Sequence, residues 1–364
     1  TYGEAVDLEY CRPITFHRHD GKFSVKLDAG ESICVSGQVQ TKLNDGLKRI
    51  KGLQQALDYY KLACTPTYLP NGKADTASYQ ASLLEWSISK LNDLRLRMPN
   101  AGGLIIAPNI LVAEYMAELL EVLDGEKPVL VHNRVGNPEG KISAFRNSKK
   151  RWIVSVAMIS EGVDIPRLRV LTYLPNAQTE LSFRQAMGRV VRNFGPNDDT
   201  RAYVVMPTHR VFEEYARRVE MEMSPTAGKP SDTPKTKICS DCGAECSLDS
   251  EACHECDSEF PNRIPRMQCC DECEALNPLS AKECNTCGVS FIHDFEISLN
   301  EALRVGAIIR GMDLDEDEVQ EGETIAEDVR IGVLSSGDHQ LIKVLRQLPE
   351  ESYGRLSRIL ENVR

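Results

Sequence analysis

The chain has 364 residues, of which 41% are hydrophobic and 27% charged, so it can form two or three domains with packed cores. No apolar run approaches about 18 residues and no signal-peptide pattern is visible, so we expect a cytoplasmic protein with no membrane partner. The net charge of −11 lacks the basic excess of a typical nucleic-acid-binding domain. Nine carboxylates without a Lys or Arg lie in residues 313–328, however, and the remainder is close to neutral, so nucleic acid is not excluded.

The first hundred residues carry two different patterns. Residues 1–35 contain short segments typical of strands, and we expect residues 14–26 to form a hairpin that turns at Asp20-Gly21. Residues 36–100 are expected to be a mainly helical insertion, because their apolar residues recur at helical spacing.

Residues 101–221 alternate between short apolar runs and amphipathic stretches. This alternation predicts an α/β fold with a parallel sheet that helices cover on both faces. The predicted strands cover residues 103–108, 128–132, 152–159, 169–174 and 201–207. The predicted helices cover residues 109–122, 138–148, 178–192 and 209–221.

Three further parts follow the alternating region. Residues 222–237 contain three Pro and several Ser and Thr, which predicts an interdomain linker. Two small cysteine-rich modules are expected at residues 238–262 and 263–293. Residues 294–364 are expected to comprise an acidic linker and a final helix over about 338–362.

Two stretches in the alternating region point to a ligand. Residues 160–166 (SEGVDIP) directly follow a predicted strand, at the edge where open α/β sheets bind ligands. Residues 185–192 (QAMGRVVR) are predicted to be helical, with four residues on one face: Gln185, Gly188, Arg189 and Arg192. Arginine side chains bind phosphate oxygens in a planar fork and a glycine permits close approach, so this face suits an anionic ligand. Each stretch alone is unspecific, but their order and spacing in a β–α–β frame favour a functional interpretation.

These stretches resemble motifs V and VI of superfamily 2 helicases, especially the type III restriction enzyme and XPB-like translocases of the DEAD/DEAH-box group. Residues 103–109 (GLIIAPN) occupy the place of motif IV, and residues 141–168 resemble the run into motif V. The resemblance covers residues 101–221 well and residues 1–35 loosely. It implies that residues 101–221 form the C-terminal RecA-like lobe of such a motor, with residues 1–35 as lead-in strands.

The resemblance also implies roles for individual residues. The motif VI arginines, here Arg189 and Arg192, are implied to reach the γ-phosphate of ATP across the interlobe cleft, which Gln185 supports. The implied nucleotide-binding positions are Gly162, Asp164 and Gly188. Ser160 is implied to couple the nucleic-acid backbone to the ATP state. A basic cluster provides expected phosphate contacts, with an ordinary solvated helix end as the equal alternative: Lys149, Lys150 and Arg151.

The sequence lacks the other half of an ATP site. It contains no G-x-x-x-x-G-K-[S/T] phosphate loop and no D-E-x-H or D-E-A-D box, which belong to the first lobe of such motors. The chain also begins with Thr1. We therefore expect a C-terminal portion of a longer protein, or one subunit of a two-subunit motor, that shares ATP and Mg²⁺ with a missing first lobe. Alone, this chain is expected to be inactive.

Ten of the thirteen cysteines lie between Cys239 and Cys287, and eight of them form two sets with the same C-x₂-C-x₁₀-C-x₂-C spacing. Each set predicts a closed structural Zn²⁺ site, with an iron–sulfur cluster or redox dithiols as alternatives, and the modules resemble double zinc ribbons. Cys246 and Cys269 are surplus, and Cys269 competes with Cys270 as a ligand. The predicted ligands are Cys239, Cys242, Cys253 and Cys256, then Cys270, Cys273, Cys284 and Cys287.

Taken together, the motifs predict the C-terminal motor lobe of an ATP-dependent nucleic-acid helicase or translocase. The form of motif V favours DNA over RNA. The zinc-bearing tail is expected to dock nucleic acid or a protein partner, and its many carboxylates favour a protein. The alternative is a non-catalytic, zinc-bearing scaffold with a degenerate helicase lobe.

Overall fold

The structure is a computed structural model. It describes residues 2–8, 10–26, 32–37, 57–156, 165–176, 179–193, 201–223, 236–261, 267–270, 272–278, 280–291 and 294–298. The predicted motif V positions Ser160, Gly162 and Asp164 lie outside the described residues, as does the predicted final helix over 338–362. Among the described helices, none is both long and apolar enough to cross a membrane.

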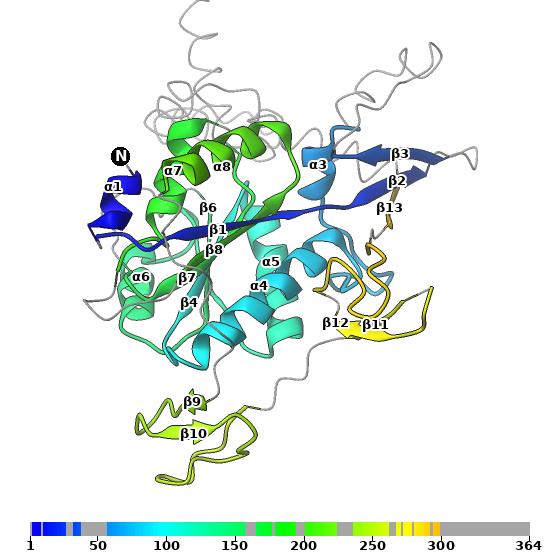
Figure 1. Cartoon of the computed structure of the whole chain (residues 1–364). Helices are drawn as coiled ribbons and strands as arrows, with labels where there is room; N and C mark the ends of the chain where they lie inside the picture. The colour runs from blue at the N-terminus through cyan, green and yellow to red at the C-terminus, as the bar shows by residue number, and fades with distance from the viewer. Residues whose placement is uncertain are drawn as a thin grey trace, which may run out of the picture.

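A six-stranded sheet forms the centre of the molecule (Figure 1). The strand order is β1-β8-β7-β4-β6-β5, and every neighbouring pair is parallel. The strands are β1 (Ile14–His19), β4 (Gly102–Ala107), β5 (Val129–Val131), β6 (Trp152–Val156), β7 (Leu168–Tyr173) and β8 (Ala202–Pro207). All five strands predicted within 101–221 are present, because continuous apolar runs suit strands that are buried on both faces.

Helices cover both faces of this sheet (Figure 1). One face carries α4 (Tyr79–Arg95) and α5 (Ile110–Asp124), and the other carries α6 (Pro138–Arg146), α7 (Glu180–Gly188) and α8 (Arg210–Glu222). A polar side chain accepts a backbone N–H at the start of each of four helices and fixes where it begins: Ser78, Asn109, Asn137 and Thr179. The arrangement is the predicted α/β, RecA-like fold.

The predicted hairpin over residues 14–26 is wrong. β1 joins the central sheet beside β8, whereas β2 (Lys22–Lys26) leaves it and lies between β3 (Ser32–Ser36) and β13 (Asp294–Ser298) in a second, three-stranded sheet. Gly21 lacks the positive φ that an Asp-Gly hairpin turn needs. A Cβ on Gly21 would lie 3.0 Å from the rings of Phe295 and Tyr79, so its small size serves close packing instead.

The described part of the predicted insertion, residues 57–100, packs as part of the lobe. α4 lies against β7 and β8, where the Ser87 hydroxyl hydrogen-bonds the Thr172 hydroxyl at 2.8 Å. The short helix α3 (Tyr59–Ala63) is wholly buried, and the Tyr60 hydroxyl donates to the carbonyl of Pro175 at 2.6 Å. This segment therefore supplies one of the two helices that cover one face of the sheet.

A buried ion pair joins the end of α5 to the start of β6. The Asp124 carboxylate, which is fully buried, accepts hydrogen bonds from Arg151 Nε at 2.6 Å and Trp152 Nε1 at 2.9 Å. Arg151 also donates to the Asn92 side chain of α4 at 2.6 Å. The pair thus connects two helices of one face to a central strand.

Replacing Asp124 with Ala should lower the free energy of unfolding by about 3–5 kcal/mol, because Arg151 would stay buried without its counter-charge. Asp93→Ala is the matched control, since it removes an exposed pair with Lys90 on α4 and should cost less than about 1 kcal/mol. Urea unfolding followed by circular dichroism measures both changes. Equal losses in the two variants would contradict the prediction.

Candidate functional site

Helix α7 carries the first half of the predicted motif VI. Phe183, Ala186 and Met187 form its buried face, whereas Gln185 is exposed. On the flank, Arg184 forms an ion pair with Glu222 of α8 at 2.7 Å. The buried face and this ion pair fix the helix against the lobe, so that the Gln185 side stays at the surface.

The helix ends earlier than predicted. α7 stops at Gly188, and Arg189 is its C-cap, with its N–H donating to the carbonyl of Ala186 at 3.1 Å. Arg192 lies beyond the helix in an isolated antiparallel bridge with Cys11. The four predicted residues therefore do not share one helix face, because the backbone after Arg189 pairs with the segment before β1 instead of continuing the helix.

Arg12 braces the end of this motif. It is 1% exposed, its N–H donates to the carbonyl of Val191 at 2.7 Å, and its guanidinium donates to the carbonyl of Arg192. The hydroxyl of Tyr2 in turn donates to the carbonyl of Arg12 at 2.6 Å. Nothing in the sequence around Arg12 marks it for this role, which depends on segments 180 residues apart meeting at one end of the sheet.

The residues of this motif are partly exposed. Among the described residues, no atom lies within 4 Å of a Cβ built on Gly188, and Arg192 is exposed while Arg189 is half-buried. Two arginines that are at least partly exposed therefore lie on a braced backbone near a glycine. Such a surface can receive a phosphate-bearing ligand that another domain holds.

The two cysteine sets lie in four turns of the same geometry. In each turn the residue after the second cysteine has a positive φ, and its N–H donates to the carbonyl of the first cysteine at 2.8–3.0 Å. Only glycine adopts this conformation without strain. The four residues are Gly243 (φ 78°), Asp257 (φ 57°), Glu274 (φ 57°) and Gly288 (φ 74°).

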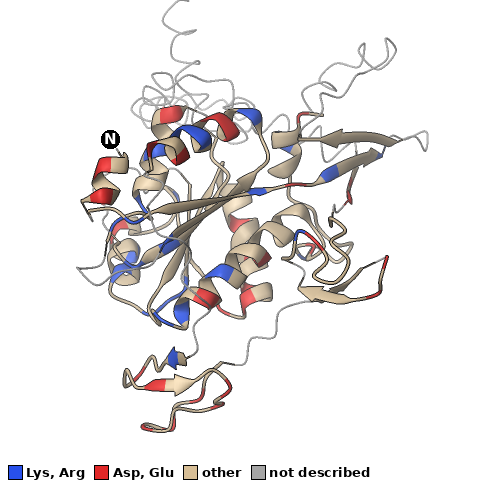
Figure 2. Cartoon of the chain, in the orientation of Figure 1, with Lys and Arg blue, Asp and Glu red and all other residues tan. Residues whose placement is uncertain are grey.

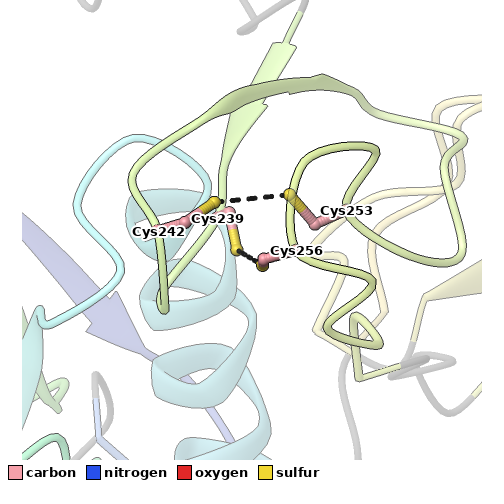
Figure 3. A group of neighbouring side chains, drawn as sticks. All are labelled: Cys239, Cys242, Cys253 and Cys256. Carbon is pink, nitrogen blue, oxygen red and sulfur yellow. Dashed lines mark hydrogen bonds between the residues drawn. The ribbon is translucent and has the colours of Figure 1, made fainter.

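Each set of four sulfur atoms converges on one point, as Figure 3 shows for the first set. The Sγ atoms of Cys239 and Cys256 lie 3.6 Å apart, and those of Cys242 and Cys253 lie 3.5 Å apart. In the second set, both corresponding distances are 3.5 Å. A tetrahedral Zn²⁺ with bonds of about 2.3 Å places its sulfur ligands about 3.8 Å apart, so both sets fit a metal of this kind.

Backbone amides prepare one cysteine of each set for metal binding. Hydrogen bonds led by the N–H of Glu255 lower the pKa of Cys253 to about 6, and bonds led by the N–H of Cys287 lower the pKa of Cys284 to about 6. Thiolates are the metal-binding form of cysteine, so both groups are available as ligands at neutral pH.

The two surplus cysteines, Cys246 and Cys269, lie in different positions relative to the four-cysteine sets. Cys269 Sγ points to the carbonyl of Glu274 at 3.3 Å, and Cys270 lies in the four-sulfur group. Cys246 is 3% exposed and its Sγ lies 3.7 Å from that of Cys253. It therefore lies directly beside the first cysteine set.

Comparison with known families covers the region that contains α7. Residues 88–194 match the model described as helicase conserved C-terminal domain. This segment is therefore similar to a helicase C-terminal domain. It extends from within α4 through β7 and α7 and ends just after Arg192, so the match includes the predicted motif VI.

Relatives and solved structures with partial similarity also exist. Uncharacterized proteins of Mycobacterium tuberculosis and Mycobacterium leprae are each 29% identical to 63% of this chain, which spans only 35% of their length. Dbp5 of S. cerevisiae bound to RNA and ADP BeF3 aligns with a TM-score of 0.32 and 10% identity, over 50% of this chain and 47% of that one. The Hef helicase domain of Pyrococcus furiosus aligns with a TM-score of 0.28 and 17% identity, over 38% and 27%.

The predicted nucleic-acid cluster on the helicase C-terminal domain needs correction. Arg151 is buried against Asp124, with a side chain 6% exposed, so it is not available to a phosphate. Lys149 donates to the carbonyl of Ser240 at 2.7 Å and to Asp241 at 3.0 Å, and so faces the first cysteine module. Lys149 and Arg151 both precede β6, so they lie at the sheet edge opposite the carboxyl ends of the parallel strands. Lys150 is exposed, and its role stays a prediction.

The strained turn after Cys273 provides a test of the metal sites. Replacing Glu274 with Gly should tighten metal binding in the second module by roughly tenfold, because a non-glycine residue in the left-handed region costs about 1–2 kcal/mol. Competition with a chromogenic chelator measures this affinity. Gly243→Glu, the matched change in the first module, should weaken binding there, and an unchanged affinity in both variants would contradict the assignment.

Proposed function

We propose that this chain is the second motor lobe of an ATP-dependent nucleic-acid helicase or translocase, with DNA as its substrate. Its partner is a first RecA-like lobe, on the same longer chain or on another subunit. The observation that carries the proposal is the braced position of Arg189 and Arg192 at the open surface of a helicase C-terminal domain.

In this proposal the two arginines act across the interlobe cleft. ATP with Mg²⁺, held by the first lobe, supplies the phosphoryl group that is transferred to water. Arg189 and Arg192 stabilise the negative charge that develops on the γ-phosphate, while Arg12 holds their backbone in register. Gln185 supports the cleft from the exposed side of α7, and Gly188 leaves room for the phosphates. The resemblance to motif V assigns Gly162 and Asp164 to the nucleotide and Ser160 to the nucleic-acid backbone.

Replacing Arg189 or Arg192 with Ala should reduce DNA-stimulated ATP hydrolysis by about 10³-fold or more, because each removes a charge that stabilises the transition state. The assay uses the longer protein, or the complex, that contains both lobes, and measures phosphate release with and without DNA. RNA in place of DNA should give weaker stimulation.

Arg217→Ala is the matched control, since Arg217 is an exposed arginine on α8 of the same lobe. It should leave the rate within about twofold of the parent, as expected for a surface substitution. Full activity in both motif VI variants would reject the motor function and favour the non-catalytic scaffold. Stronger stimulation by RNA than by DNA would overturn the DNA preference alone.

We also propose that the two cysteine sets hold structural Zn²⁺ and that the tail docks a protein. Four thiolates leave no open coordination position for catalysis. Most charged residues of the first module are acidic (Figure 2), which disfavours phosphate contacts and favours a basic protein surface. The exposed carboxylates are Asp241, Glu245, Asp249, Glu251, Glu255, Asp257 and Glu259.

The chain should retain two tightly bound Zn²⁺ after brief treatment with a mild chelator, one for each four-sulfur group. Cys239→Ser and Cys270→Ser should each lose one ion and keep the other, because the modules have separate ligands. Plasma mass spectrometry measures the zinc content. Loss of both ions in either single variant would contradict independent sites, and iron in place of zinc would support a cluster.

A further inference from the structure

The two cysteine modules differ at a pair of corresponding positions beside the metal set. In the second module these are Asn277 and Asn285. The Asn277 side chain donates to Cys284 Sγ at 3.4 Å and accepts from the N–H of Asn285 at 2.8 Å, so it supports a ligand and the turn that carries it. In the first module Cys246 and His254 occupy the same two positions. Both differences replace an amide side chain with a metal-binding one.

The distances around Cys246 have the values of a ligand set. Its Sγ lies 3.7 Å from Cys253 Sγ and 3.4 Å from His254 Nδ1, and the three ligand atoms lie within 4.8 Å of one another. A tetrahedral Zn²⁺ separates two sulfurs by about 3.8 Å, and a sulfur from an imidazole nitrogen by about 3.6 Å. The sulfur–sulfur distances of 3.5–3.6 Å in the four-cysteine sets agree with these values no better.

The environment of His254 also suits a metal ligand. Its Nδ1 faces Cys246, while its Nε2 lies 3.5 Å from the Glu255 carboxylate. A carboxylate on the outer nitrogen orients a metal-bound imidazole and raises its basicity. His254 is 60% exposed on its side chain, whereas Cys246 is buried, so an ion held between them would have one side open to solvent.

We propose that Cys246, Cys253 and His254 form a second metal site in the first module, which shares Cys253 as a bridging thiolate with the four-cysteine site. The site takes a thiophilic divalent cation, Zn²⁺ or Cd²⁺. Three protein ligands leave a fourth position for water or a small anion, unlike the two closed sites. This proposal rests on the zinc assignment of the four-cysteine sets, and it gives the first module a labile ion that the second module lacks.

The ion should bind more weakly than the two structural ions, because it has fewer protein ligands and lies beside another cation. It should therefore be lost first to a chelator and regained in excess metal. In the simpler alternative, Cys246 only donates a hydrogen bond from its S–H to Cys253 Sγ, and no further ion binds. The side-chain N–H of Asn277 donates to Cys284 Sγ in the same way in the second module.

Titration of the metal-free full chain with Cd²⁺ separates the two cases. Native mass spectrometry counts the ions, and the near-ultraviolet charge-transfer absorbance of cadmium thiolates reports their ligands. We expect three ions on the parent chain. Cys246→Asn and His254→Asn, which introduce the residues of the second module, should each bind two. The exposed position of His254 makes its variant the safer test where Cys246→Asn disturbs folding.

The internal repeat also provides a gain-of-site variant. Asn277→Cys combined with Asn285→His transfers the ligand pair to the second module and should add one ion to the parent count. A parent chain that binds two ions at saturation, with no loss in His254→Asn, would overturn this site and leave the structural zinc proposal intact. A parent chain that binds fewer than two would overturn both.

Discussion

An all-parallel sheet has no face that can remain in water, and this constraint organises the RecA-like lobe. Its strands are apolar on both sides, so helices must cover each face. The chain meets this requirement on one face with α4 and α5 and on the other with α6, α7 and α8. Because α7 must bury Phe183, Ala186 and Met187 against the sheet, the opposite side of the same helix becomes a surface. Gln185 occupies that surface as a consequence of packing, whereas Arg189 and Arg192 follow the end of the helix.

The cysteine modules cannot be stabilised in the same way as the lobe, because they are too small to bury a hydrophobic core. Each consists of two short strands and two turns, and the first has only a small apolar cluster of Cys239, Cys246 and Cys253 with Ala244 and Phe260 against it. Metal ligation replaces hydrophobic burial as the source of stability in domains of this size. One turn geometry occurs four times, with one left-handed residue in each turn, and these turns bring the four sulfurs of each set together.

Polar contacts connect the modules to the lobe. The first module meets the end of α4, where the N–H of Ile238 donates to the carbonyl of Leu96 at 2.8 Å, and Lys149 adds an exposed ion pair. The second meets the edge strand β1, where Lys282 donates to the carbonyl of Arg18 at 2.7 Å. Exposed ion pairs contribute little, so these contacts orient the modules more than they stabilise them. After the second module, β13 pairs with β2 in the three-stranded sheet, so residues 294–298 lie beside residues 22–26.

The sequence alone determined the alternating strands and helices, the paired cysteines and the two motifs, because each depends on residues close together in the chain. Periodicity places apolar faces, and spacing places two thiolates in one turn. Only the tertiary structure decided which side chains remain exposed and can contact a ligand. Arg151 was expected to bind phosphate but neutralises Asp124 inside the lobe. The end of α7 and the brace from Arg12 depend on pairing between segments far apart in sequence, where long-range contacts override the local helical pattern.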